Sequence, residues 1–190
     1  TISHYETPLH LARHYDGWVN RELIGFYERY CRVLFERYGH RVRRWLTFNE
    51  INSVLHEPFL SGGIATPKEQ LSLTDLHQAI HHELVASARV TRMAHEMMPG
   101  AHIGCMILAV PVYPLTPSPD DVVAAMHTEH ANLVFGDVHC RGQYPGYHLR
   151  YLAEHDVDLQ ITDTDRDDLT HTVDFVSFSY YASICETATP

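Results

Sequence analysis

An alternation of strands and amphipathic helices is the feature of this sequence that most restricts its fold. Residues 1–8 begin as the end of a strand, and residues 21–38 repeat apolar side chains at helical spacing until Gly39 ends the helix. Residues 42–50 then follow as a short strand of bulky apolar side chains. Two strands joined through a helix lie parallel in one sheet. The sequence therefore predicts an α/β fold with a parallel sheet.

Elements of the same kinds follow along the rest of the chain. The segment 51–72 has several Pro and Gly residues and little periodicity, and we expect a long loop there. Loops of this length are usually functional, so this loop is a candidate wall of a substrate site. The residues at 102–108 are apolar on both faces, as in a buried parallel strand. In order, we expect a helix at 72–98, a strand at 102–108, a helix from 118 to about 135, a loop at 137–147, a short helix at 148–154 and a strand at 173–181.

Charge and cysteine usage limit the partners of the chain and its compartment. The formal net charge is −10 with His neutral, which argues against nucleic acid and anionic membrane as partners. No apolar run approaches the ~18 residues of a membrane span, and no signal-peptide pattern opens the sequence. The four cysteines are scattered without a Cys-x-x-Cys pair, as is typical of reduced thiols. We therefore expect a cytoplasmic protein.

The 16 histidines raise the question of a metal site. His77 and His81 lie four residues apart on a predicted helix, and His127 and His130 lie three apart. A zinc site needs further ligands, and no Cys or carboxylate stands at a recognised spacing from either pair. We therefore expect a histidine-rich surface, with no metal ion and no cofactor.

Polar residues end the predicted strand at 42–50. The chain passes from bulky apolar side chains directly to Asn49 and Glu50. Chemistry in parallel α/β folds collects where strands reach their carboxyl edge, and a carboxylic acid beside an amide suits general acid/base catalysis. The alternative from these residues alone is a polar strand end on an exposed loop.

The stretch Thr47-Phe48-Asn49-Glu50 resembles the Thr-Phe/Leu-Asn-Glu-Pro motif of glycoside hydrolase family 1. Other stretches resemble motifs of the same family in the same order, and the likeness is greatest to the 6-phospho-β-glucosidase branch. Two positions depart from the usual pattern, with Tyr5 in place of Trp and Ser179 in place of Asn. The similar stretches are His4-Tyr5-Glu6-Thr7-Pro8 near the N-terminus, Gly104-Cys105-Met106, Tyr113 to Asp120, Asp137 to Tyr147, and Val173 to Tyr181.

The resemblance implies a partial (β/α)8 TIM barrel that runs from roughly the end of strand three through strand six. A complete barrel of this kind typically has ~250 residues, whereas the chain has 190. Residues 1–190 are therefore expected to be a fragment of a single glycosidase barrel domain.

The resemblance also implies site residues and a substrate. Glu50 corresponds to the acid/base of the family, and Asn49 to a residue that binds the sugar 2-hydroxyl. His4 corresponds to a residue that donates a hydrogen bond to a sugar hydroxyl, and Tyr181 to the tyrosine that hydrogen-bonds the nucleophile. The reaction is hydrolysis of 6-phospho-β-glucosides with retention, in which two carboxyl groups stand about 5–5.5 Å apart.

The second carboxylate and the phosphate-binding residues are not found among the motifs of this chain. The family nucleophile lies in an Ile/Val-Thr-Glu-Asn-Gly motif, to which Ile161-Thr162-Asp163-Thr164 has only a superficial similarity. We therefore expect the 190-residue chain to be inactive by itself and its full-length parent to be the enzyme. The alternative is a non-catalytic sugar-binding or scaffold protein derived from the same barrel.

Strands taken from a closed barrel have unpaired edges. An unpaired strand edge is a template for another chain, and exposed apolar surface on this scale marks an interface. We therefore expect the fragment to associate with itself, most simply as a two-fold dimer.

Overall fold

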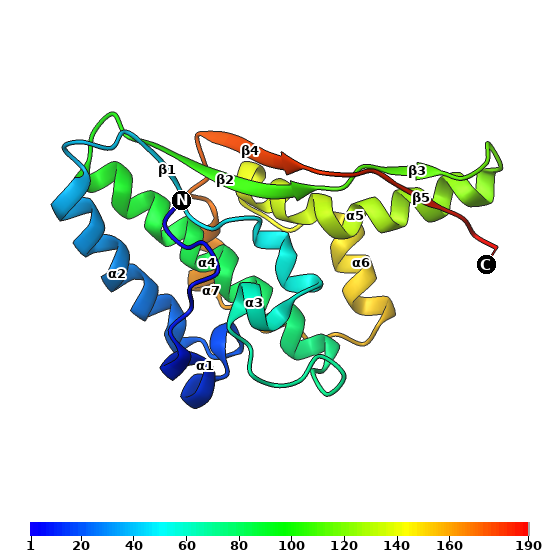
Figure 1. Cartoon of the computed structure of the whole chain (residues 1–190), viewed down its shortest axis with the longest axis horizontal. Helices are drawn as coiled ribbons and strands as arrows, with labels where there is room; N and C mark the ends of the chain where they lie inside the picture. The colour runs from blue at the N-terminus through cyan, green and yellow to red at the C-terminus, as the bar shows by residue number, and fades with distance from the viewer. Residues whose placement is uncertain (190) are drawn as a thin grey trace.

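The computed structural model describes residues 1–189, and a parallel three-stranded sheet runs along its upper side in Figure 1. The strands lie in the order β1 (Arg44–Leu46), β2 (His102–Ala109) and β4 (Phe175–Tyr180). Both neighbouring pairs are parallel. The predicted parallel α/β fold is thus confirmed.

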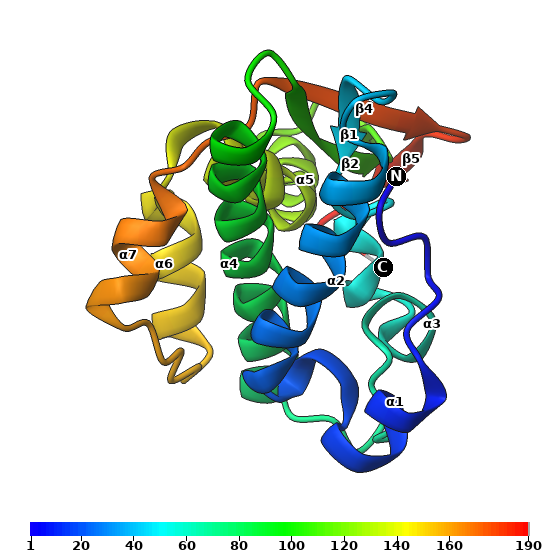
Figure 2. The ribbon, with the colours of Figure 1, turned by 90° about the vertical axis from the view of Figure 1, so that its left-hand side faces the viewer.

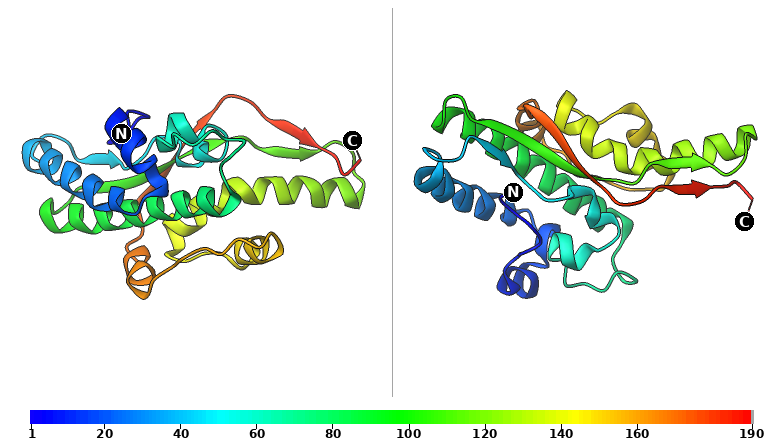
Figure 3. Two further views of the ribbon diagram at one scale, coloured as in Figure 1. Left: turned by 90° about the horizontal axis from the view of Figure 1, so that it is seen from below. Right: turned by 45° about the horizontal axis from the view of Figure 1, so that its top comes forward.

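The N-terminal segment adds a further position to this sheet beside β1. The Ile2 N–H donates to the Leu46 carbonyl oxygen at 2.7 Å, and Ser3 forms a parallel bridge with Phe48. The order across the sheet therefore follows the order along the chain. Two short strands, β3 (Val112–Pro114) and β5 (Ile184–Glu186), pair in parallel beyond the ends of β2 and β4 (Figure 3, right).

Helices cover one face of the sheet and form a layer beneath it (Figures 1 and 2). The longest of them, α4, lies between α2, α5 and α7 and is buried along most of its length. No helix of residues 1–189 is both long enough and apolar enough to cross a membrane. The helices are α1 (Leu9–Tyr15), α2 (Glu22–Tyr38), α3 (Pro58–Gly62), α4 (Leu73–Met97), α5 (Pro119–Arg141), α6 (Gly146–Glu154) and α7 (Asp163–Leu169), with 3₁₀ helices at Gly17–Val19 and Ile51–Leu55.

Aromatic side chains join α2 to β1 and to the segment that follows it. The Trp45 ring meets Phe35 of α2 edge-on, with centroids 5.2 Å apart. Phe48 stacks on Tyr27 at 4.7 Å, and the Tyr27 hydroxyl donates to the Thr47 carbonyl oxygen. Buried aromatic rings of this size each contribute several kcal/mol to stability. This packing fixes the strand whose end bears Asn49 and Glu50.

Several predicted elements differ in extent from the structure, including the loop predicted at 137–147, which is helical to Arg141. The strand predicted at 42–50 is shorter, since β1 covers only Arg44–Leu46 and one isolated bridge follows at Phe48. The left-handed Glu50, with φ of +42°, turns the chain away from the sheet after that bridge. The helix predicted to stop near residue 135 continues to Arg141, since one glycine inside a helix costs only about 1 kcal/mol. It ends at Gly142, whose φ is +70°. The predicted loop at 51–72 contains α3 and a 3₁₀ helix.

The prediction of a histidine-rich surface is wrong for the longest helix. The side chains of His77 and His81 are only 5% and 0% exposed. They are buried because α6 and α7, which come much later in the sequence, pack near the side of α4 that the periodicity assigned to solvent. The imidazole rings of His81 and His82 both form hydrogen bonds with other groups of the protein.

The helix layer does not reach across the edge strand β4. Neighbours in a parallel sheet point to the same side, so Val176 and Phe178 lie on the face that also bears Cys105 and Ile107. Cys105 is buried, whereas Val176 and Phe178 are 50% and 67% exposed. Tyr180 continues this row and is 58% exposed. The outer face of β4 is therefore an uncovered apolar strip.

Candidate active site

Asn49 and Glu50 stand where the chain leaves β1. The Asn49 N–H donates to the Ser3 carbonyl oxygen at 2.9 Å, which holds this end to the N-terminal segment. The side chain of Asn49 is 7% exposed, and that of Glu50 is half-buried. The left-handed conformation of Glu50 is costly for a residue other than glycine. It turns the chain sharply into the 3₁₀ helix Ile51–Leu55.

Tyr5 is the direct hydrogen-bond partner of the Glu50 carboxylate. Its hydroxyl donates to Glu50 Oε2 at 2.6 Å, and Ser53 Oγ lies 3.2 Å from the same hydroxyl oxygen. Tyr5 is also left-handed, with φ of +71°. Burial is the largest cause that raises the pKa of Tyr5, followed by its hydrogen bond to Glu50. The tyrosine therefore keeps its proton throughout the neutral range.

Asn52 fixes the segment after Glu50 to the middle strand of the sheet. Its side-chain amide donates to the Leu108 carbonyl oxygen at 2.9 Å and accepts from the Leu108 N–H at 2.8 Å. The same amide nitrogen lies 2.9 Å from Asn132 Oδ1 of α5. Asn52 is fully buried. Its side chain thus continues, beyond the end of β1, the pairing that a strand would make with β2.

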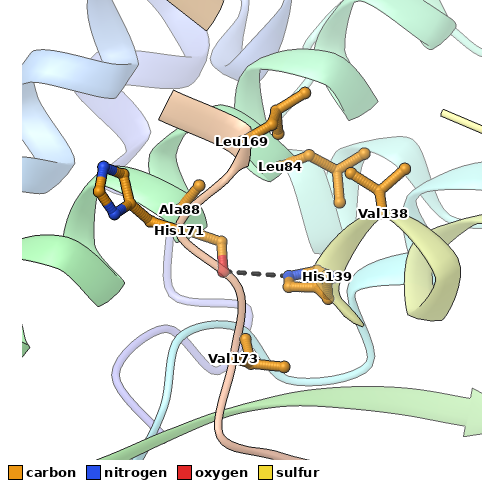
Figure 4. Close-up of a pocket in the computed structure, with 8 residues that line it drawn as sticks. Leu84, Ala88, Val138, His139, Leu169, His171 and Val173 are labelled. Carbon is orange, nitrogen blue, oxygen red and sulfur yellow. Dashed lines mark hydrogen bonds between the residues drawn. The ribbon is translucent and has the colours of Figure 1, made fainter. Parts of the chain in front are cut away.

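A buried polar chain supports the strand end from below. Thr47 Oγ1 lies 2.8 Å from Ser87 Oγ of α4. His139 Nε2 of α5 lies 3.0 Å from the same oxygen, the contact drawn as a dashed line in Figure 4. His139 Nδ1 donates to the Phe135 carbonyl oxygen at 2.7 Å. Burial lowers the pKa of His139 to about 4, so the ring is neutral near pH 7 and its Nε2 accepts from Ser87.

The cavity beside this polar chain is a packing void. Leu84, Val138, Leu169 and Val173 line it together with His139 (Figure 4). Its volume is about 10 Å³, which is enough for at most one water molecule. It cannot hold a substrate.

A larger groove of about 380 Å³ lies between the N-terminal segment and α2. Its walls include Leu11, Trp18, Phe26 and Tyr30, and Glu6 is its one acidic residue. Neither this groove nor the small void is lined by Glu50.

The two outer members of the predicted site lie on either side of Glu50. His4 is exposed, and its ring meets Tyr5 edge-on with centroids 5.5 Å apart. Tyr181 follows β4 directly and is 78% exposed. Because β2 separates β1 from β4, Tyr181 is on the same edge of the sheet as Glu50 but two strand positions away. Hydrogen bonds bring Tyr5 together with Glu50, and they do not include Tyr181.

Sequence reasoning did not identify Tyr5 and Asn52 as partners of this site. Their contacts join Tyr5 to Glu50 across 45 residues and Asn52 to Leu108 across 56. No local pattern encodes such pairings.

The stretch Ile161-Thr162-Asp163-Thr164 has a local structural role. The Thr162 side chain accepts from the Asp165 N–H at 3.1 Å, and the Asp165 side chain accepts from the Thr162 N–H at 2.9 Å. This is a capping box that starts α7. Asp165 also pairs with Arg21 and His81. The stretch is thus the start of a helix that packs on α4.

The sequence and the fold are both similar to those of known glycosidases. The profile described as Glycosyl hydrolase family 1 matches residues 1–190. A 6-phospho-beta-glucosidase of Clostridium longisporum is 55% identical over 188 residues, which are 99% of this chain and 40% of the relative. An aryl-phospho-beta-D-glucosidase of Bacillus subtilis is 49% identical over 191 residues, 100% of this chain and 41% of the relative. The chain thus spans about 40% of the length of these relatives.

Solved structures show the same fold. The GH1 beta-glucosidase from Exiguobacterium antarcticum B7 superposes with a TM-score of 0.81 at 23% identity, over 98% of this chain and 42% of that one. The family 1 β-glucosidase from Thermotoga maritima superposes with a TM-score of 0.79 at 27% identity, over 95% of this chain and 40% of that one.

Proposed function

The chain belongs to glycosyl hydrolase family 1, and we propose that it forms the acid/base half of a retaining 6-phospho-β-glucosidase. The observation that supports this most is the placement of Glu50. Its half-buried carboxylate stands at the carboxyl edge of a parallel sheet, beside the Asn49 amide and in a hydrogen bond with Tyr5. This is the edge at which barrel enzymes carry out their chemistry.

The proposed place of the chain in the barrel is the end of strand three through strand six. The N-terminal pair with Phe48, then β1, β2 and β4, would be these four strands in order. Their parallel pairing in sequence order supports the assignment. The uncovered strip on β4 also supports it, because a strand of a (β/α)8 barrel is covered by helices on its outer face. Residues 1–190 would then be part of one barrel domain.

Each site residue would have a distinct role in retaining hydrolysis. Glu50 would protonate the leaving oxygen and later take a proton from the attacking water. Asn49 would bind the sugar 2-hydroxyl, His4 would donate to another sugar hydroxyl, and Tyr181 would orient the nucleophile. The nucleophilic carboxylate and the phosphate-binding groups would come from sequence outside residues 1–190.

The proposed substrate is a 6-phosphorylated β-glucoside. The names of the two curated relatives given above support the phosphorylated class. The four free cysteines support the proposal of a cytoplasmic location.

A chimera tests this function. Residues 1–190 replace the matched segment of the Clostridium longisporum relative, and hydrolysis of an aryl 6-phospho-β-glucoside is measured. We expect activity, which Glu50→Gln lowers by about a hundredfold to ten-thousandfold because the general acid is lost. The loss is expected to be greatest for poor leaving groups. Glu69→Gln, at an exposed position, is the matched control.

Two results would contradict the proposal. Full activity of the Glu50→Gln chimera would show that Glu50 is not the acid/base. Turnover by the isolated 190-residue chain would show that no second carboxylate from elsewhere is needed. Tight sugar binding without turnover in the chimera would favour the non-catalytic alternative.

A further inference from the structure

The Tyr5 hydroxyl stands at the centre of a small polar group. Glu50, Ser53 and Asn49 are the side chains that act on it, and Glu50 is the only carboxylic acid of the three. Ser53 is 8% exposed and Asn49 is 7% exposed. The hydroxyl of the half-buried Tyr5 thus has two protein oxygens, Glu50 Oε2 and Ser53 Oγ, within hydrogen-bond distance.

We propose that Tyr5, with Ser53 behind it, is the positioning residue that holds the Glu50 carboxyl group in both of its protonation states. The proposal rests on the acid/base role proposed above for Glu50. Tyr5 acts through Glu50 and keeps its own proton, so it is not a second catalytic acid.

The hydrogen bonds of two hydroxyl groups can reverse without leaving a polar atom unpaired. A hydroxyl has one donor and two acceptor positions. When Glu50 is ionised, Tyr5 donates to Oε2 and Ser53 donates to the Tyr5 oxygen. When Glu50 is protonated, its O–H donates to the Tyr5 oxygen and Tyr5 donates to Ser53. The oxygen positions at 2.6 Å and 3.2 Å serve both arrangements.

The backbone is organised to maintain this contact. Tyr5 and Glu50 both have left-handed φ values, +71° and +42°. Non-glycine residues in this conformation are uncommon and persist where the surrounding structure holds them. Here the Asn49 N–H bond to the Ser3 carbonyl oxygen joins the two segments next to the strained residues. The two strained residues are the two partners of one hydrogen bond, which indicates that the strained backbone is kept because it forms this contact.

Tyr5→Phe in the chimera tests the proposal, because it keeps the ring and removes only the hydroxyl. We expect kcat to fall about tenfold to a hundredfold, the range for a lost hydrogen bond to a charged group, with KM changed less than about threefold. The fall is expected to be larger for poor leaving groups, as with Glu50→Gln. The alkaline limb of the kcat/KM profile should move to higher pH. Both protonation states of Glu50 lose a hydrogen bond, but the bond that Tyr5 donates to the charged carboxylate is the stronger one, so the ionised state loses more.

Further variants separate positioning from packing. Ser53→Ala should move the limb in the same direction by a smaller amount, and Ser53→Thr, which keeps a hydroxyl, should recover most of that loss. Tyr38→Phe, at an exposed position on α2, is the control for removal of a tyrosine hydroxyl. Thermal melting of each variant reports whether the fold is intact.

The outcomes distinguish this proposal from the function on which it rests. Retained activity in Glu50→Gln would overturn the proposed function. The positioning role alone would be overturned by a different pair of results. Glu50→Gln would be inactive, while Tyr5→Phe would show the same alkaline limb of kcat/KM and the same leaving-group dependence as the control Tyr38→Phe. If Tyr5→Phe does not fold, Ser53→Ala provides the test. An alkaline limb of kcat/KM at the same pH as in the parent chimera would then overturn the proposal.

Discussion

Asn52 shows at the scale of one residue how the strand end is held. Asn52→Ala leaves the N–H and the carbonyl group of Leu108 without their side-chain partner. We expect the free energy of unfolding to fall by about 2–3 kcal/mol, since buried unpaired groups cost about 1–3 kcal/mol each. Urea unfolding of the 190-residue chain measures this. Gln70→Ala, at an exposed position, is the control and should change the free energy of unfolding little. Equal free energies of unfolding for the two variants would show that the Asn52 side chain does not stabilise the fold.

Buried histidines determine how stability depends on pH. Burial lowers the pKa of four imidazoles to about 4, whereas in the unfolded chain they titrate near pH ~6.5. Between these values the unfolded chain binds more protons than the folded chain, so the free energy of unfolding falls as pH decreases from about 6.5 to about 4. The four residues are His77, His82, His139 and His148.

His139→Gln tests this dependence at one position. The variant removes one titrating group, so its free energy of unfolding should fall less steeply with decreasing pH than that of the parent chain. Urea unfolding at several pH values measures the slope. His40→Gln, at an exposed position, is the control and should keep the parent slope. An unchanged slope in His139→Gln would contradict the prediction.

At the scale of elements, α7 is attached to α4 through Asp165. Its carboxylate, which is fully buried, accepts from Arg21 and lies 3.3 Å from His81 Nε2. These donors and the Thr162 cap hold the pKa of Asp165 well below its usual range against the opposing effect of burial. Asp165→Ala should lower the free energy of unfolding by about 2–3 kcal/mol. Asp163→Ala, at an exposed position in the same helical turn, should cost clearly less in the same urea experiment.

The elements also show how far the sequence can predict this fold. Ser72 caps α4, and the observed helix matches the predicted one because the signals are local. The burial of His77 could not be predicted, since it depends on α6, about 70 residues later. The same holds at the site. The motif at Asn49 and Glu50 predicted where a carboxylate stands, but the contact with Tyr5 depends on the tertiary structure.

At the scale of the whole molecule, the uncovered strip on β4 predicts self-association. Val176, Phe178 and Tyr180 present an apolar row at the free edge of the sheet, and such a row beside an unpaired strand edge favours pairing with a second copy. Sedimentation of the 190-residue chain at micromolar concentration should show a dimer or larger species. Phe178→Lys should shift it toward monomer, while Gln143→Lys, with the same charge change, should not. A well-folded monomer of the parent chain would contradict this prediction.

The hydrogen bonds around Glu50 have a consequence for the order in which the protein is made. Tyr5, Glu50, Ser53 and the Asn52 contact with Leu108 all lie within the first 108 residues. Synthesis proceeds from the N-terminus, and loop closure over about 50 residues costs little more than over shorter spans. The acid half of the catalytic pair can therefore assemble on the ribosome while β4 is still untranslated. A nascent chain arrested shortly after α5 should already protect the Asn49 amide from hydrogen exchange.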